Sequence, residues 1–269
     1  MKDLWTVIRL ELLLFRRGRT YWLIGPLLIF GGILTAGIES TEPWRMWLNE
    51  AFLCLLITLI LGVTTVNQLQ RDNERHIDGV LMSTPVTTNA YVWGKYLAGL
   101  LILVGFACLE VLTAMVTDHL VNRGTYGSLG PWPYLATWGW LTLMTLVFVA
   151  ALPLFLMTLT RGQRAISYVA LLVIWLLPLF LQNVPQVLVV WGGMDEIPTD
   201  PAFQVGAHHI NDSSIAPALA QQIIHLVQTT IPQADITPTF LWNRLLFISL
   251  AVLLVMGTAF SLQRQRQGF

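Results

Sequence analysis

The chain has 269 residues, of which 55% are hydrophobic and only 11% are charged, and its mean hydropathy is +0.65. Soluble proteins carry roughly 25% charged residues, so this composition excludes an ordinary soluble domain and indicates a chain that folds in lipid. The formal net charge is zero, which argues against nucleic acid as a partner. Two cysteines, Cys54 and Cys108, lie in apolar runs far from other metal-ligand residues, and we interpret both as buried small hydrophobes.

The N-terminal segment Lys2–Arg17 predicts an amphipathic helix that lies in the inner membrane interface. It is not read as a signal peptide, because its charged region runs to Arg19 and no clear small-residue cleavage site follows. One helical face is apolar and the opposite face is mostly basic. Glu11 projects among the apolar residues, where a carboxylate needs a cation or a hydrogen-bond donor from elsewhere, unless it reaches water.

Six apolar runs are long enough, or nearly so, to cross about 30 Å of hydrocarbon. Each must be a helix, because a lone strand would leave its backbone polar groups unpaired in lipid. The predicted spans are residues 21–38, 51–69, 91–116, 133–159, 165–190 and 240–262. Pro26, Pro153, Pro178 and Pro185 fall inside these spans, and we expect kinks or local breaks there, above all near Pro185.

The distribution of Arg and Lys predicts the orientation of the bundle. Only three basic residues, Arg45, Arg123 and Arg244, fall on one side of the predicted spans. The other basic residues all fall on the opposite side: Lys2, Arg9, Arg16, Arg17, Arg19, Arg71, Arg75, Lys95, Arg161, Arg164, Arg264 and Arg266. The sequence therefore predicts a multi-pass protein of the cell membrane with both termini in the cytoplasm. Acidic residues such as Asp118 lean toward the outer side.

Between the second and third runs, residues 71–99 form a polar, charged patch on the predicted cytoplasmic side. Glu74-Arg75, Ser83-Thr84-Pro85-Val86 and Gly94-Lys95 follow one another along it. In these residues the segment resembles the first cytoplasmic loop of ABC-2 type transporter permeases. Many relatives carry Glu-Arg-Gly-Thr where this chain has Glu74-Arg75-His76-Ile77, with its glycine at Gly79. The resemblance extends more loosely from the N-terminal helix to the sixth span.

The resemblance implies an all-α membrane protein: a cytoplasmic amphipathic helix over residues 1–19 and a six-helix ABC-2 domain over residues 20–269. A coupling loop at residues 70–90 would contain a short helix that ends before Pro85 and docks on a separate ABC ATPase, which binds ATP and Mg. Glu11 would pin the N-terminal helix to a cytoplasmic loop. A second permease subunit, identical or not, would complete the transport path. The implied ATPase-coupling residues are Glu74, Arg75, His76, Asp78, Leu81, Met82, Ser83, Thr84 and Pro85.

The predicted external loop, residues 192–239, is long for a connector and is therefore expected to be folded or functional. Apolar residues at near-helical spacing within residues 216–228 favour a short helix on the outer membrane surface, like the hairpin that family members carry at the exit of the transport path. The loop also holds the cluster most similar to metal ligands: His208, His209, Asp212 and His225. Its spacing matches no familiar metal site, so polar loop residues are the better interpretation.

Glu110 is the acidic residue that lies deep inside a predicted span, roughly 28 Å along the helix from Tyr91. A carboxylate in a membrane span is by default a functional hypothesis, and it should be neutral or hydrogen-bonded and face the dimer interface or the transport path. The structural alternative is that it joins the third span to a neighbour. The candidate partners are Thr58, Thr64 and Thr142.

No Walker A motif, HExxH pair or GxSxG elbow occurs in the sequence, so we expect no catalysis by this chain itself. The preferred hypothesis is the transmembrane subunit of an ABC-2 type exporter of unidentified cargo. A noncatalytic immunity or scaffold protein is the first alternative. An intramembrane enzyme acting on lipid is the second, although it would need paired carboxylates or histidines at matching depth. A neighbouring gene for a P-loop ATPase without spans would favour the permease.

Overall fold

A computed structural model describes residues 2–17, 24–34, 87–121, 135, 138–160, 163–180 and 238–266. Every regular element in these ranges is a helix, which agrees with the predicted all-α class. The labelled elements are α1 (Lys2–Arg17), α5 (Thr88–Val121), the π-helical turn η3 (Trp138–Leu143), α7 (Met144–Leu159), α8 (Arg164–Phe180) and α11 (Pro238–Arg266). A further helix, Ile24–Leu34, carries no label. The second predicted span, the external loop and Pro185 lie outside the described residues.

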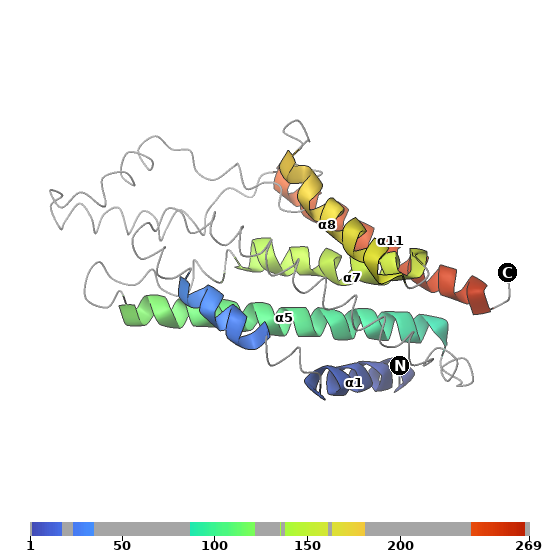
Figure 1. The fold of residues 1–269 in the computed structure, drawn as a ribbon, viewed down its shortest axis with the longest axis horizontal. Coiled ribbons are helices and arrows are strands. Elements are labelled where there is room, and N and C mark those ends of the chain that lie inside the picture. Colours follow the sequence, from blue (N-terminus) through green and yellow to red (C-terminus); the bar gives the residue numbers. More distant parts are fainter. Residues whose placement is uncertain are drawn as a thin grey trace, which may run out of the picture.

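The long helices alternate in direction along the molecule (Figure 1). α5 runs one way, whereas α7 and α11 run the other way beside it. As a result α1, the start of α5, the end of α7, the start of α8 and the C-terminal end of α11 gather at one end of the molecule. The predicted topology assigns all of these segments to the cytoplasmic side. Two points stay predictions: that this end of the molecule faces the cytoplasm, and that the chain has six spans.

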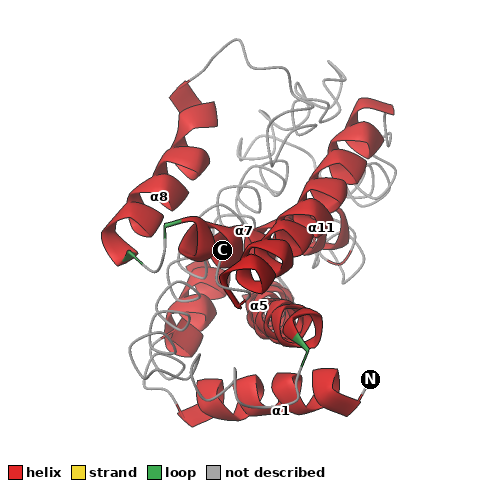
Figure 2. Cartoon of the chain, turned by 90° about the vertical axis from the view of Figure 1, so that its right-hand side faces the viewer, coloured by secondary structure: helices red, strands yellow, loops and turns green. Residues whose placement is uncertain are grey.

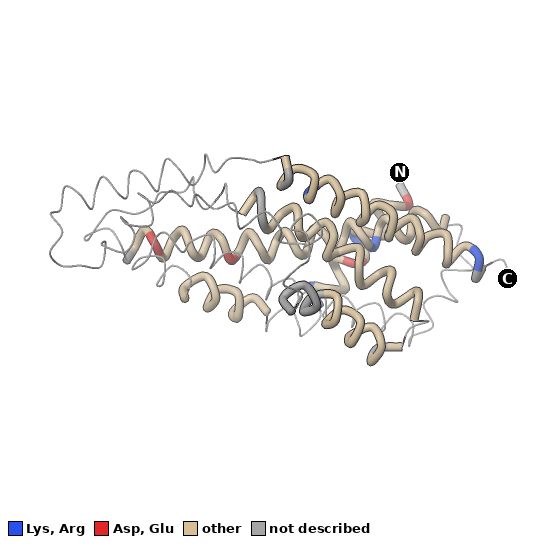
Figure 3. Tube along the Cα trace, turned by 90° about the horizontal axis from the view of Figure 1, so that it is seen from above, with Lys and Arg blue, Asp and Glu red and all other residues tan. Residues whose placement is uncertain are grey.

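Two described helices, Thr88–Leu120 and Phe240–Arg264, are long and apolar enough to cross a membrane. In a soluble protein such helices would be core elements and mostly buried, but only 33% and 28% of their most apolar windows are buried here. Their outward faces are apolar, as Leu253 on α11 (62% exposed) illustrates. Lys, Arg, Asp and Glu are sparse along the described helices (Figure 3). An apolar exterior of this kind is stable in lipid and not in water.

The core of the described helices lies around α7, which packs against α11, α5 and α8. Small buried residues, Ala150 and Ala151 on α7 and Ala251 on α11, allow close approach of the backbones. A T-shaped pair of Phe148 and Phe247 rings, with centroids 5.1 Å apart, joins the same two helices. Tertiary packing of this density fixes how α7 and α11 lie relative to each other.

α7 contains Pro153, where the sequence predicted a kink or a break. The helix continues through Pro153 to Leu159, so no break occurs there, and a kink at Pro153 stays a prediction. The irregularity lies upstream instead, in the π-helical turn η3 that leads into α7. Proline is tolerated inside a membrane helix when neighbouring helices pack around it, and α7 is buried along most of its length.

Candidate functional site

Helix α1 lies across the first turns of α5. Figure 2 looks nearly along α5, whereas α1 is seen there along its length. The sequence favours this helix because Asp3 lies in its first turn and Arg16 and Arg17 in its last, which complements the helix dipole. Its bounds are those predicted from the amphipathic pattern. A helix that crosses a span in this way can lie in the plane of the membrane interface, a location that stays a prediction.

Close backbone contact holds α1 on α5 at Gly94. A Cβ atom built on Gly94 would lie 2.7 Å from Cγ1 of Val7 and 3.4 Å from the carbonyl oxygen of Leu4. Real Cβ atoms do not approach so closely, so only glycine permits this crossing. Farther along, the rings of Phe15 and Phe106 meet edge to face with centroids 5.8 Å apart. The contact therefore runs along most of α1.

An ion pair lies between these two contacts. The Nζ atom of Lys95 is 2.8 Å from Oε1 of Glu11, and the two side chains are only 7% and 10% exposed. The ammonium group also lies 5.2 Å from the centroid of the Tyr91 ring, at cation–π distance. The cation that Glu11 needs thus comes from α5 itself, whereas the sequence placed the partner of Glu11 in a cytoplasmic loop. A buried charge of this kind is stable only when paired.

The predicted ATPase-coupling residues, from Glu74 to Pro85, lie outside the described residues. The structure does describe where α5 begins after them. Thr87 precedes the helix, its Oγ1 accepts a hydrogen bond of 3.3 Å from the Ala90 N–H, and its carbonyl accepts one of 3.0 Å from Tyr91. Thr87 therefore acts as the N-cap of α5. The rigid helix starts directly after the predicted coupling segment, and Lys95 lies near that start.

Glu110 is 1% exposed and thus lies inside this chain, not on a surface where a second subunit could cover it. Helix Ile24–Leu34 passes close by, because a Cβ atom on Gly32 would lie 2.8 Å from the Glu110 carbonyl oxygen. Oε1 of Glu110 has no hydrogen-bond partner among the described residues. Thr142 is buried as well, but no hydrogen bond joins it to Glu110. Thr142 is therefore not the partner that the structural alternative required; Thr58 and Thr64 lie outside the described residues.

Sequence reasoning missed three buried polar residues, one near the end of α5 and two near the start of α11. Asp118 is 2% exposed, Asn243 0% and Arg244 5%, and none of the three is without a partner. The guanidinium carbon of Arg244 lies 4.5 Å from the centroid of the Phe240 ring. The sequence treated Asp118 and Arg244 as charges facing the outer side, because both lie near the ends of apolar runs. The aromatic residue four positions before Arg244 was the available signal.

Within the residues that the structure describes, no three His, Cys, Asp or Glu side chains gather as a metal site would need. The weak candidate at His208, His209, Asp212 and His225 lies outside those residues. Cys108 is a free, half-buried thiol on α5, and Cys54 is not among the described positions.

The long helices with apolar exteriors indicate a membrane protein, in which α1 packs on α5. A model of the ABC-2 family transporter proteins matches residues 19–196 of the chain. The chain therefore belongs to the ABC-2 transporter family and is a membrane permease of the ABC type, as its resemblance predicted. No curated protein matches the chain.

Proposed function

We propose that the chain is the transmembrane subunit of an ABC-2 type exporter, which couples ATP hydrolysis by a separate ATPase to the movement of a substrate across the cell membrane. The observation that carries this proposal is the family match over residues 19–196, which includes both the predicted coupling segment and α5. ATP and Mg would be bound by the ATPase and not by this chain. A second permease subunit would complete the translocation path, and both termini would lie in the cytoplasm.

The described contacts support a route by which motion of the ATPase could reach the membrane helices. A push on residues 74–85 would be passed to α5 at its capped start, next to Thr87. α5 would carry α1 with it, because Glu11 and Lys95 are ion-paired. On its other side, the hydroxyl group of Tyr96 on α5 donates a hydrogen bond of 3.1 Å to the Val147 carbonyl of α7. α5 is thus the helix through which α1 and α7 would move together.

Charge reversal in the coupling segment tests the proposal. Glu74→Lys combined with Asp78→Lys should abolish co-purification of the co-expressed ATPase and its stimulation by the permease. Asp195→Lys with Glu196→Lys makes the same change in charge on the predicted external loop and serves as the matched control. The proposed docking site is wrong if both double variants retain the ATPase equally while remaining folded by circular dichroism.

The predicted orientation is tested separately by cysteine labelling in intact cells, in a variant whose two native cysteines are replaced. A membrane-impermeant maleimide should label a cysteine at position 212 and not one at position 264. Labelling at 264 without labelling at 212 would overturn the topology, and with it the placement of residues 74–85 beside a cytoplasmic ATPase.

A further inference from the structure

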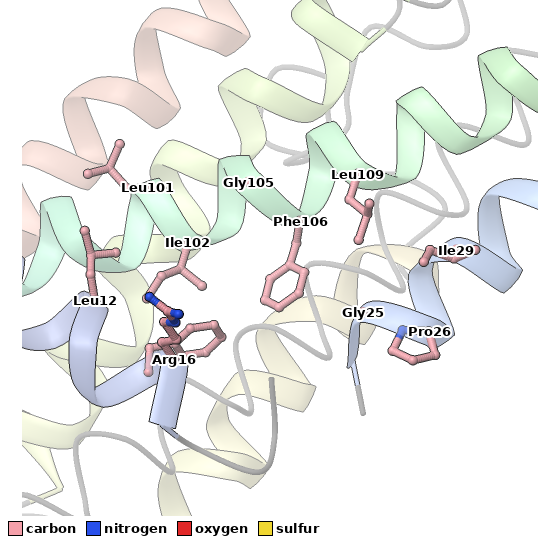
Figure 4. Close-up of a pocket in the computed structure, with 11 residues that line it drawn as sticks. Leu12, Arg16, Gly25, Pro26, Ile29, Leu101, Ile102, Gly105, Phe106 and Leu109 are labelled. Atoms are coloured by element: carbon pink, nitrogen blue, oxygen red, sulfur yellow. The ribbon is translucent and has the colours of Figure 1, made fainter. Parts of the chain in front are cut away.

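A hollow of about 730 Å³ lies between the end of α1, the helix Ile24–Leu34 and the middle of α5 (Figure 4). Most of its wall is aliphatic and comes from all three helices: Leu12, Pro26, Ile29, Leu101, Ile102 and Leu109. Leu101 is 50% exposed and Ile29 is 39% exposed, so the hollow opens on the apolar exterior of the bundle. In a membrane, that exterior faces the lipid chains.

Two glycines keep this hollow open. Gly25 and Gly105 both line it, and a Cβ atom built on either would meet no atom within 4 Å. Gly94 differs from these two glycines, because Val7 packs tightly into the space that a side chain at Gly94 would occupy. The space in front of Gly25 and Gly105 is therefore unfilled by the chain itself, and its volume is in the range of ligand pockets.

Arg16 is the charged residue among those that line the hollow. Its guanidinium group lies at the α1 end of the hollow, near Ile102 (Figure 4). Unlike Glu11 on the same helix, Arg16 has no ion pair or hydrogen bond with any residue that the structure describes. The hollow thus has apolar walls and an available cation at one end. That combination matches an amphiphile with an anionic head group and an aliphatic chain.

We propose that this hollow binds an anionic membrane phospholipid, with its phosphate on Arg16 and one acyl chain along α5. From Leu101 to Leu109 the wall extends about 12 Å at the helical rise of 1.5 Å per residue. This length is less than half of a hydrocarbon core of about 30 Å, so one leaflet accommodates it. The head group then lies at the level of α1, the amphipathic helix. The proposal depends on the membrane location of the chain and not on its role as an exporter.

Native mass spectrometry of the purified full-length protein tests the proposal, with equal amounts of phosphatidylglycerol and phosphatidylcholine that carry identical acyl chains. The wild-type protein should retain one phosphatidylglycerol per chain in preference to phosphatidylcholine. Arg16→Gln should lower phosphatidylglycerol retention about fivefold and phosphatidylcholine retention by less, because the choline ammonium already offsets the charge on its phosphate. Arg17→Gln removes the same charge from the neighbouring exposed position, which does not line the hollow, and should have no such effect.

A second pair of variants tests the apolar part of the site. Gly105→Leu should fill the hollow and reduce retention of both lipids, whereas Gly99→Leu should not, because Gly99 has equally open space but lies outside the hollow. Equal retention by Arg16→Gln and Arg17→Gln, or by the two glycine variants, overturns the proposal. If Gly105→Leu changes the number of subunits instead of lipid retention, the occupant is a second copy of the chain and the lipid assignment is wrong.

Discussion

The ion pair between Glu11 and Lys95 gives the sharpest prediction about how α1 is held on α5. Both side chains are nearly buried and their charged atoms are 2.8 Å apart. Removing one partner of a buried pair costs about 3–5 kcal/mol, because the remaining charge is left uncompensated. Lys95→Met, which leaves the Glu11 carboxylate buried, should therefore weaken the docking of α1 by that amount.

The two single variants Glu11→Gln and Lys95→Met should differ in how strongly they weaken the docking of α1. After Glu11→Gln, the ammonium group of Lys95 keeps the Tyr91 ring at 5.2 Å, and the new amide oxygen still accepts a hydrogen bond. Together these remaining interactions should make Glu11→Gln about 1–2 kcal/mol less costly than Lys95→Met. The double variant Glu11→Leu with Lys95→Met removes both charges and should be less destabilised than Lys95→Met alone.

Hydrogen exchange of the α1 amides, in the full-length protein in lipid nanodiscs, measures the loss of docking free energy, because the exchange rate reports local opening of the helix. A loss of 3 kcal/mol corresponds to exchange that is faster by about 150-fold. Asp3→Asn removes an exposed charge from the same helix and should change exchange by about fivefold or less. The reasoning fails if Lys95→Met exchanges like Asp3→Asn, or if the effects in the double variant simply add.

Three further pairs of substitutions follow from the packing. Gly94→Ala puts a methyl group 2.7 Å from an α1 side chain and should lower the free energy of unfolding, measured in detergent, by about 1–3 kcal/mol. Gly99→Ala places its methyl group in open space and should be neutral or stabilising. Gly32→Ala, whose methyl group would meet an α5 carbonyl oxygen at 2.8 Å, should destabilise in the same assay, and Gly25→Ala should not. Glu110→Leu should fold as stably as Glu110→Gln, since Oε1 has no hydrogen-bond partner among the described residues; unfolding of the leucine variant alone would show that the carboxylate is a structural link.

Hydropathy predicted the apolar centres of the long helices better than their ends. The predicted spans 91–116 and 240–262 lie within α5, which runs from Thr88 to Val121, and α11, which runs from Pro238 to Arg266. The additional turns of α5 carry the charged residue Asp118, which a hydropathy window counts against a span. Asp118 is only 2% exposed, so its environment depends on tertiary packing that no local window contains.

The sequence predicted the separate parts of the candidate site but not the contact between α1 and α5 that brings them together. The amphipathic pattern gave the bounds of α1 and predicted that Glu11 needs a cation or a hydrogen-bond donor unless it reaches water. Gly94 and Lys95 were recognised as a motif at the foot of the third span. That the glycine makes room for α1 and the lysine supplies its cation depends on how two helices cross, and helical periodicity gives no information on such crossings. The apolar pattern likewise does not predict the π-helical turn at Trp138–Leu143.

Site-specific photo-crosslinking in cells tests the central claim most directly. A photoreactive amino acid at position 81, in the predicted coupling segment, should capture a P-loop ATPase that has no membrane spans. The same amino acid at position 212, in the predicted external loop, should capture none. If position 81 yields no ATPase, or if position 212 yields it instead, the chain does not couple to an ATPase through this segment.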